Sequence, residues 1–85
     1  MSDLKKRFED AAAAVKKLKE DPGNDAKLQL YALYKQGSEG DVAGKRPGFT
    51  DMIGRAKYDA WAKTKGMSKD EAMKKYAELV KSLGG

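Results

Sequence analysis

Apolar residues recur at every third or fourth position in four separate stretches of this chain, which is the spacing of an amphipathic helix. No run alternates apolar and polar residues at period two for long enough to predict a β-strand. The clearest stripe is the first one: Leu4, Phe8, Ala11, Val15 and Leu18. The pattern therefore predicts an all-α fold, with four helices packed in one bundle.

Each predicted helix begins at a residue whose side-chain oxygen can accept a backbone N–H bond. These candidate caps are Ser2 or Asp3, Asn24 or Asp25, Thr50 or Asp51, and Ser68. Ser68 with Glu71 three residues later forms a capping box, which is a fairly specific signal of a helix start. The first helix should end at Asp21-Pro22-Gly23, because the residue before a proline is steered out of the α region. Gly66 should stop the third helix.

The inward faces of the last two helices follow from the same periodicity. The third helix should bury Phe49, Met52, Ile53, Ala56, Ala60 and Trp61, and the fourth Ala72, Met73, Tyr76, Val80 and Leu83, with Leu79 beside them. Residues 38–48 form a long connector, which we expect either to cross a bundle end to a non-adjacent helix or to be functional. It is not a phosphate loop, because three residues rather than four separate Gly40 from Gly44-Lys45, and Arg46 replaces the hydroxyl that holds magnesium.

Composition narrows the class of protein. A chain of 85 residues is expected to form one domain, spanning residues 1–85. It contains no cysteine and no histidine, so we expect no disulfide, no metal site, no cofactor and no catalytic residue of the usual kinds. The net charge of +5 favours anionic partners. No apolar run follows the basic N-terminus or is long enough for a membrane span, so we expect a soluble cytoplasmic protein.

The second helix carries an unusual gradient over residues 28–36. At about 100° per residue, Leu33, Leu30, Tyr34, Tyr31, Lys35 and Leu28 follow one another around one wide arc. The arc passes from apolar side chains through two phenols to a cation. Such a face suits a ligand that is partly apolar, partly aromatic and partly anionic. The alternative is that both tyrosines are boundary residues and that Lys35 lays its stem on the core with its ammonium group in water.

The order of motifs resembles the acyl-CoA-binding protein family over nearly the whole chain. The resemblance is carried by Phe8-Glu9-x-Ala11-Ala12, Tyr31-x-x-Tyr34-Lys35-Gln36, Arg46-Pro47-Gly48, Ala56-Lys57-Tyr58-Asp59-Ala60-Trp61 and Ser68-Lys69-x-x-Ala72-Met73-x-x-Tyr76. It implies an up-down-down-up bundle that binds medium- and long-chain fatty acyl-CoA thioesters as an intracellular carrier or pool former, without catalysis.

The resemblance also implies roles for individual residues. Tyr34 would stack on the adenine, while Tyr31, Lys35 and Lys57 would surround the 3′-phosphate of the ribose. Lys16 and Tyr76 would add polar contacts, and Ala32 and Leu33 would complete the ligand-binding residues. The acyl chain would lie between the second and third helices, along Leu28, Ile53 and Ala56.

Three positions depart from the family pattern. Ile53 replaces a lysine near the CoA phosphates, a contact that Arg55 could partly supply. Lys27 replaces a methionine that often lines the acyl groove in the family, and this replacement bears on the length of acyl chain that the groove prefers. Tyr58 replaces a tryptophan and keeps an aromatic ring.

Three other classes of protein remain to be weighed against this one. Basic charge with interleaved tyrosines is compatible with a nucleic-acid binder, but acidic residues are spread throughout and no helix is basic along a whole face. An enzyme would have to rely on carboxylates such as Asp41, Asp51 and Asp59, which we interpret as loop, cap and surface residues. A structural interaction module is the remaining alternative. We expect a monomer and no nucleic-acid partner.

Overall fold

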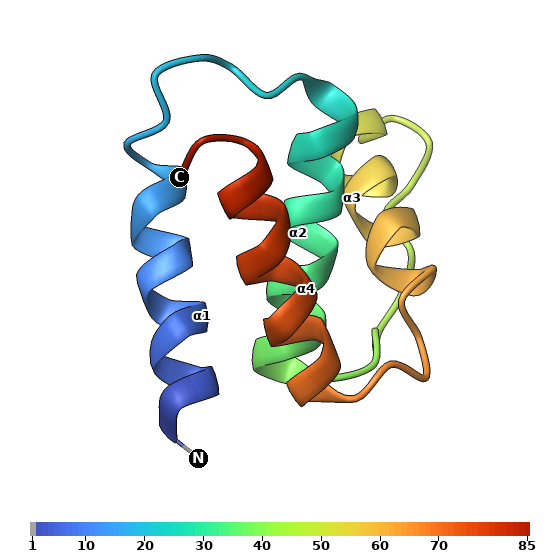
Figure 1. The fold of residues 1–85 in the computed structure, drawn as a ribbon. Helices are drawn as coiled ribbons and strands as arrows, with labels where there is room; N and C mark the ends of the chain where they lie inside the picture. The colour runs from blue at the N-terminus through green and yellow to red at the C-terminus, as the bar shows by residue number, and fades with distance from the viewer. Residues whose placement is uncertain (1) are drawn as a thin grey trace.

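Four helices make up the fold in the computed structural model, which describes residues 2–85 and, of Ser2, only the backbone. They are α1 (Ser2–Val15), α2 (Asn24–Glu39), α3 (Met52–Ala62) and α4 (Lys69–Ser82), and residues 2–85 contain no strand. Figure 1 shows α1 and α4 running in one direction and α2 and α3 in the other. The predicted all-α, up-down-down-up bundle is confirmed.

The packing is centred on α4, which lies against both α1 and α2, whereas α3 packs mainly against α2. The core consists of Phe8, Ala11, Leu30, Tyr76 and Val80, all less than 10% exposed. Fully burying one large apolar side chain contributes about 1.5–3 kcal/mol. The inward face predicted for α4 is confirmed, because Ala72, Tyr76 and Val80 are its buried residues.

Gly37 allows these helices to approach closely. A Cβ atom at this position would lie 3.1 Å from the Met73 side chain and 3.2 Å from the Phe8 ring. The Phe8 ring in turn meets the Tyr76 ring edge-on, with centroids 5.1 Å apart. Glycine costs about 1 kcal/mol of helix propensity, and here that cost permits side chains from α1 and α4 to rest on α2.

The connector between α2 and α3 does not cross a bundle end. It runs along the length of the molecule, so that α3 points the same way as α2 and packs beside it (Figure 1). Of the two alternatives for this connector, the crossing to a non-adjacent helix is therefore wrong, because a long connector can also join parallel neighbours, and a functional role stays a prediction. Side chains of α3 hold the connector in place. Trp61 Nε1 donates to the Gly40 carbonyl at 2.8 Å, and the Tyr58 hydroxyl donates to the Gly44 carbonyl at 3.0 Å. Arg46 of the connector donates two hydrogen bonds, of 2.8 and 2.7 Å, to the Asp59 carboxylate.

Gln36 ties α2 to two loops. Its side chain is fully buried, and its amide donates to the Asp41 carboxylate at 2.8 Å and to the Met67 carbonyl at 2.7 Å. Its amide oxygen accepts a bond from the Thr64 hydroxyl at 2.9 Å. Asp41 also accepts from the Gly66 N–H, and this bond, with the Gln36 amide, lowers the pKa of its carboxyl group.

Two predicted helix caps are confirmed. Asp51 accepts the Gly54 N–H at 2.9 Å, and Ser68 accepts the Glu71 N–H at 3.0 Å. At α2 the prediction was wrong, because Gly23 occupies the cap position and no side chain caps the helix. Instead, Asp21 in the loop before α2 accepts a hydrogen bond from the Gly23 N–H at 2.8 Å and forms an ion pair with Lys27 at 2.9 Å. Of the alternatives for α1, the Ser2 side chain lies outside the described residues.

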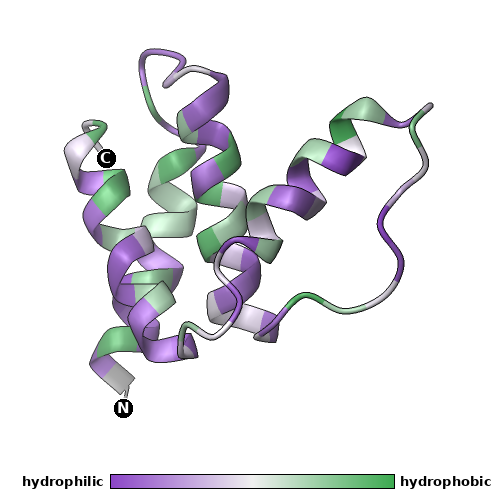
Figure 2. Cartoon of the chain, turned by 90° about the vertical axis from the view of Figure 1, so that its right-hand side faces the viewer, coloured by the Kyte–Doolittle hydropathy of each residue, from purple (hydrophilic) through white to green (hydrophobic). Residues whose placement is uncertain are grey.

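Two further expectations are corrected by the structure. Helix α1 ends at Val15, and residues 16–18 continue in tighter i→i+3 turns, so Leu18 follows the helix rather than belonging to it. Phe49, Met52 and Ile53 are 78%, 77% and 73% exposed, although their spacing predicted an inward face. The first turn of α3 and the connector before it project from the body of the molecule, beyond the cover of α2 (Figure 2).

Two absences hold for the described part of the chain. None of its helices combines the length and apolarity that crossing a bilayer requires. Residues 2–85 also contain no cluster of three acidic side chains that could hold a metal ion. The prediction of one domain over residues 1–85 stays a prediction.

Candidate ligand-binding site

The residues predicted to surround a phosphate converge from α2 and α3. The ammonium nitrogen of Lys57 lies 5.4 Å from the centroid of the Tyr31 ring, and that of Lys35 lies 5.1 Å from the centroid of the Trp61 ring. Each pair joins one residue of α2 to one of α3. Cations over aromatic faces are attracted by the ring quadrupole, so the two pairs fix both ammonium groups beside the seam between the helices.

Lys35 is held in a charged state. Its ammonium group forms an ion pair with Glu39 one turn further along α2, and its side chain is 24% exposed. The hydrogen bond that Lys35 donates to Glu39 raises the pKa of Lys35, partial burial opposes this effect, and the nearby phenols of Tyr31 and Tyr34 add to it. Lys35 is therefore a permanent cation at physiological pH, with Glu39 as its partner in this structure.

Sequence reasoning missed Glu39 and Trp61 as neighbours of the site. Lys35 and Glu39 are four residues apart on one helix, which is a recognised signal of an ion pair, so the sequence could have identified Glu39 as a neighbour of the site. Trp61 had been assigned to the apolar side of its helix. Its position one turn after Lys57 could have placed it on the same face, but its contact with Lys35 depends on how α2 and α3 pack.

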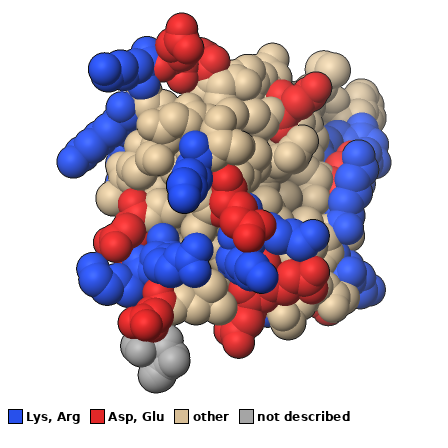
Figure 3. Space-filling view, in the orientation of Figure 1, with Lys and Arg blue, Asp and Glu red and all other residues tan. Residues whose placement is uncertain are grey.

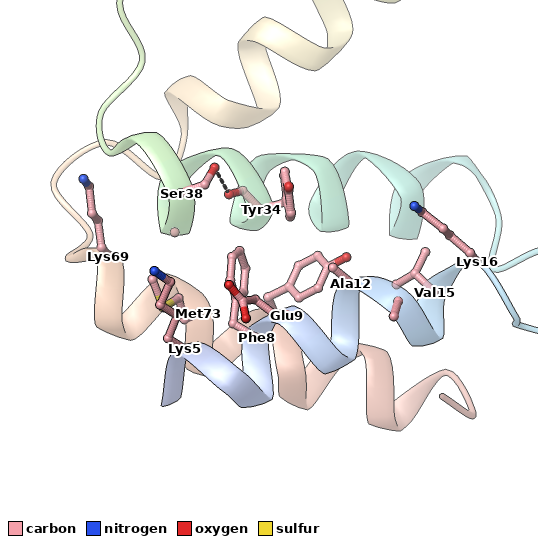
Figure 4. A pocket seen from close by; sticks show the side chains of 13 residues that line it. Lys5, Phe8, Glu9, Ala12, Val15, Lys16, Tyr34, Ser38, Lys69 and Met73 are labelled. Atoms are coloured by element: carbon pink, nitrogen blue, oxygen red, sulfur yellow. Dashed lines mark hydrogen bonds between the residues drawn. The ribbon is translucent and has the colours of Figure 1, made fainter. Parts of the chain in front are cut away.

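A first groove lies between α1 and α2, with α4 behind it, and has a volume of about 780 Å³. Phe8 and Tyr34 lie near its middle, Lys16 lies at one end, and Lys5 and Lys69 lie at the other (Figure 4). An aromatic floor between cations suits a ligand with a flat ring and anionic groups. Lys16, Tyr34 and Tyr76, which were predicted to contact the ligand from different helices, all line this one groove.

The two tyrosines of this groove differ in exposure. Tyr34 is 42% exposed, and its ring is stacked on that of Phe8 at 5.4 Å and 23°. Tyr76 is only 4% exposed and packs in the core, where burial raises the pKa of its hydroxyl group. Tyr34 therefore offers surface for stacking, while Tyr76 forms part of the support beneath it.

A second groove, of about 670 Å³, lies between α2 and α3. Its apolar wall brings together four of the predicted residues with Ala60: Leu28, Ala32 and Leu33 from α2, and Ala56 from α3. Ala32 is nearly buried at 3% exposure, so it forms the base of the groove rather than its rim. Small side chains on both helices leave the space that an alkyl chain would need.

The departures from the family pattern, Ile53, Lys27 and Tyr58, line neither of these two grooves. Ile53 is absent from the residues that line the α2–α3 groove and instead faces solvent. Lys27 is turned toward Asp21, with which it pairs. Arg55 lies close enough to Asp59 to help lower the pKa of that carboxyl group, after the larger effect of Arg46.

Tyr31 and Lys35, which meet Lys57 and Trp61 of α3, lie next to the first groove on α2. At about 100° per residue, Tyr31 lies between Tyr34 and Lys35 around the helix. Tyr34 lines the α1–α2 groove, and Lys35 contacts α3. A ligand in the first groove can therefore extend past Tyr31 to the two lysines.

Comparisons with known proteins point to one family. The protein-family model described as "Acyl CoA binding protein" matches residues 5–80 of this chain. Acyl-CoA-binding protein homolog 1 of Caenorhabditis elegans is 53% identical over 76 residues, covering 89% of this chain and 88% of that protein. Enoyl-CoA delta isomerase 2 of Homo sapiens is 48% identical over 83 residues, covering 98% of this chain but 21% of the isomerase. The crystal structure of Oryza sativa Acyl-CoA-Binding Protein 2 superposes with a TM-score of 0.90 and 44% identity, covering 94% of this chain and 89% of that one.

Proposed function

Because this chain belongs to the acyl-CoA-binding protein family, we propose that it binds medium- and long-chain fatty acyl-CoA thioesters as a non-catalytic carrier or pool former. The observation that carries the proposal is the convergence of Tyr31, Lys35 and Lys57 from two helices beside an aromatic groove. The only catalytic relative named above shares with this chain a segment of about a fifth of its length.

The nucleotide end of the ligand matches the charged part of this site. A 3′-phosphate carries close to two negative charges and strong acceptor oxygens. Lys35, Lys57 and the Tyr31 hydroxyl supply donors, and charge-assisted hydrogen bonds are stronger than neutral ones. An ammonium group has three N–H donors, so Lys35 can bind phosphate while it keeps its bond to Glu39. The adenine would stack on Tyr34, a contact that contributes about 1–3 kcal/mol for a base on an aromatic ring.

The fatty tail matches the α2–α3 groove. Each buried methylene contributes about 0.8 kcal/mol. At 1.4 kcal/mol per decade, this is roughly fourfold in affinity per carbon. The nucleotide would therefore determine which class of ligand is bound, and the tail would determine how tightly.

The charged site can be tested by removing one phosphate from the ligand. Lys35→Ala and Lys57→Ala should each weaken acyl-CoA binding by about tenfold to a hundredfold, because a hydrogen bond to a charged group is worth about 1.5–3 kcal/mol. Isothermal calorimetry should show little effect of either change on the 3′-dephospho analogue. Lys74→Ala, on an exposed position of α4, is the matched control. Equal losses for both ligands would show that these lysines do not serve the 3′-phosphate.

The tail site can be tested with a series of acyl-CoA esters. Affinity should rise steeply with chain length and then level once the groove of about 670 Å³ is full. Leu28→Ala should lower the affinity for long esters and leave free CoA unaffected. If free CoA and long-chain esters bind equally well, the groove does not hold the tail.

We also propose that the protein acts as a cytoplasmic monomer without a nucleic-acid partner. On the face drawn in Figure 3, Lys and Arg side chains alternate with Asp and Glu rather than forming a single basic stripe. Binding to a phosphate backbone would fall steeply with salt because of counterion release. A gel-shift titration should detect no specific complex with nucleic acid, and any nonspecific binding should disappear as the salt concentration rises. Sedimentation equilibrium should give the mass of one chain.

A further inference from the structure

The proposed phosphate site holds one acidic side chain that the binding of an anion does not require. The ammonium group of Lys35 donates a hydrogen bond to the Glu39 carboxylate, and the two form an ion pair. The Glu39 side chain is 54% exposed, and it lines neither of the two grooves. A carboxylate bonded to the cation that would hold a phosphate must either position that cation or compete for it.

The helix itself gains little from this carboxylate. Glu39 is the last residue of α2. The carbonyl groups at the end of a helix carry a partial negative charge, so an acidic side chain there is unfavourable. The order of the pair is also the weaker one, because a glutamate stabilises a helix more when it stands four residues before a lysine than when it stands four residues after it. Helix stability alone therefore does not account for the pair.

Lys35 lies between two sets of partners on one face of α2. Tyr31, Lys35 and Glu39 follow one another at intervals of four residues, so they line one side of the helix. On the side of Tyr31 stands Lys57, with its ammonium nitrogen 5.4 Å from the centroid of the Tyr31 ring. In this structure the Lys35 ammonium group is bound on the other side, by Glu39, and lies 5.1 Å from the centroid of the Trp61 ring. Lys35 is therefore drawn to the level of Trp61, one turn of α3 beyond Lys57.

We propose that Glu39 competes with the 3′-phosphate for Lys35, and so determines how strongly this protein distinguishes acyl-CoA from ligands that lack that phosphate. This inference rests on the proposed function, in which Lys35 and Lys57 bind the phosphate. If Lys35 keeps its bond to Glu39 when the phosphate binds, the carboxylate lies close to a group that carries close to two negative charges. Sharing of the ammonium group and repulsion between the two anions both weaken the contact. Glu39 is thus a specificity-determining residue that acts through Lys35.

Removing the charge of Glu39 should strengthen the binding of one ligand and not of the other. Glu39→Gln should raise the affinity for dodecanoyl-CoA by about threefold to tenfold, because the variant loses both an exposed ion pair and a like-charge neighbour of the phosphate. The affinity for 3′-dephospho-dodecanoyl-CoA should change by less than about twofold, because more distant charges are screened. Calorimetry measures both ligands. Glu78→Gln removes the same charge at an exposed position of α4 that lines neither groove, and it is the matched control.

Two further variants separate competition from positioning. Glu39→Asp keeps the negative charge and should show less of the gain than Glu39→Gln. In a Lys35→Ala background, Glu39→Gln should raise the affinity less than it does in the wild type, because no ammonium group remains to be shared. The gain should also shrink as the salt concentration rises, since salt screens both the ion pair and the repulsion. If Glu39→Gln instead lowers the affinity for dodecanoyl-CoA, the carboxylate positions Lys35 for the phosphate and the proposal is wrong.

The same measurements distinguish failure of this proposal from failure of the proposed function. Circular dichroism should show wild-type helix content for Glu39→Gln, and a loss of helix would mean that the carboxylate serves the fold instead. A gain of equal size for both ligands would overturn the role assigned to Glu39. If Lys35→Ala weakens dodecanoyl-CoA alone but Glu39→Gln changes nothing, the proposed function stands and this inference fails. If Lys35→Ala weakens both ligands equally, the phosphate site is wrong and this inference falls with it.

Discussion

Gln36 shows how much one buried polar side chain can organise. It is fully buried, and its three hydrogen bonds join α2 to Asp41 at the start of the connector and to Thr64 and Met67 before α4. Nothing in the sequence distinguishes it from an exposed helical glutamine, apart from its position one turn after Ala32 and Leu33. Its role depends on loops that the chain brings together from 28 and 31 residues away.

Removing these bonds should destabilise the protein. We expect Gln36→Leu to lower the free energy of unfolding by about 1–3 kcal/mol, because the Met67 carbonyl and its neighbours lose their partner in a part-buried site. Urea denaturation measures the change. Gln29→Leu makes the same substitution at an exposed position of α2 and should stay within about 0.5 kcal/mol. Equal effects of the two substitutions would contradict a structural role for the Gln36 bonds.

The binding residues could be predicted to different degrees. Of the residues assigned to the acyl groove, Leu28 and Ala56 line the α2–α3 groove, together with Ala32 and Leu33, which were predicted only as ligand-binding residues; the contact of all four with a ligand stays a prediction. Ile53 was placed in the same groove by the family resemblance and on the inward face of its helix by its spacing, yet it is exposed and does not line the groove. Spacing gives the face of a helix on which a residue lies, but not how far the neighbouring helix extends to cover it.

At the scale of single helices, the caps of α3 and α4 were predicted correctly, whereas the cap of α2 and the end of α1 were not. Asp51 and Ser68 cap α3 and α4 as expected, since a cap involves only side chain and backbone three residues apart. The end of α1 was placed too late, because the stripe of apolar residues continues to Leu18 while the backbone has already tightened after Val15.

The cap of α4 offers a test at this scale. We expect Ser68→Ala to lower the free energy of unfolding by about 1 kcal/mol, because the Glu71 N–H loses its acceptor at the helix start. Ser82→Ala, at the other end of the same helix, should cost less than about 0.5 kcal/mol. Thermal or urea denaturation of both variants checks the difference, and a larger loss from Ser82→Ala would contradict the assignment of Ser68 as the cap.

At the scale of the whole molecule, acidic side chains connect the loops to the helices beside them. The bond with Arg46 lowers the pKa of Asp59, the Gly66 N–H lowers that of Asp41, and the bond with Lys27 lowers that of Asp21. Each contact therefore favours the ionised carboxylate. Together they hold the connector on α3 and the α1–α2 loop on α2.

These pKa shifts determine how stability should depend on pH. A carboxyl group whose pKa is lower in the folded state stabilises the fold above the ordinary value of 3.8, and that contribution is lost as pH falls through the folded-state pKa. The melting temperature should therefore drop between pH 5 and pH 2. The double variant Asp41→Asn/Asp59→Asn should melt lower at pH 5 and show a smaller drop. A wild-type melting temperature that stays constant over this range would show that the carboxylates contribute nothing.

The order in which helices pack also bears on how the chain is made. Within this domain α1 is synthesised before the other three helices, yet the helix it mainly rests against is α4, the fourth. Until then the Phe8 ring lacks the Tyr76 ring that meets it in the finished core. During synthesis α1 therefore stays without its main partner until α4 has cleared the exit tunnel, and only then can the core around Phe8 close.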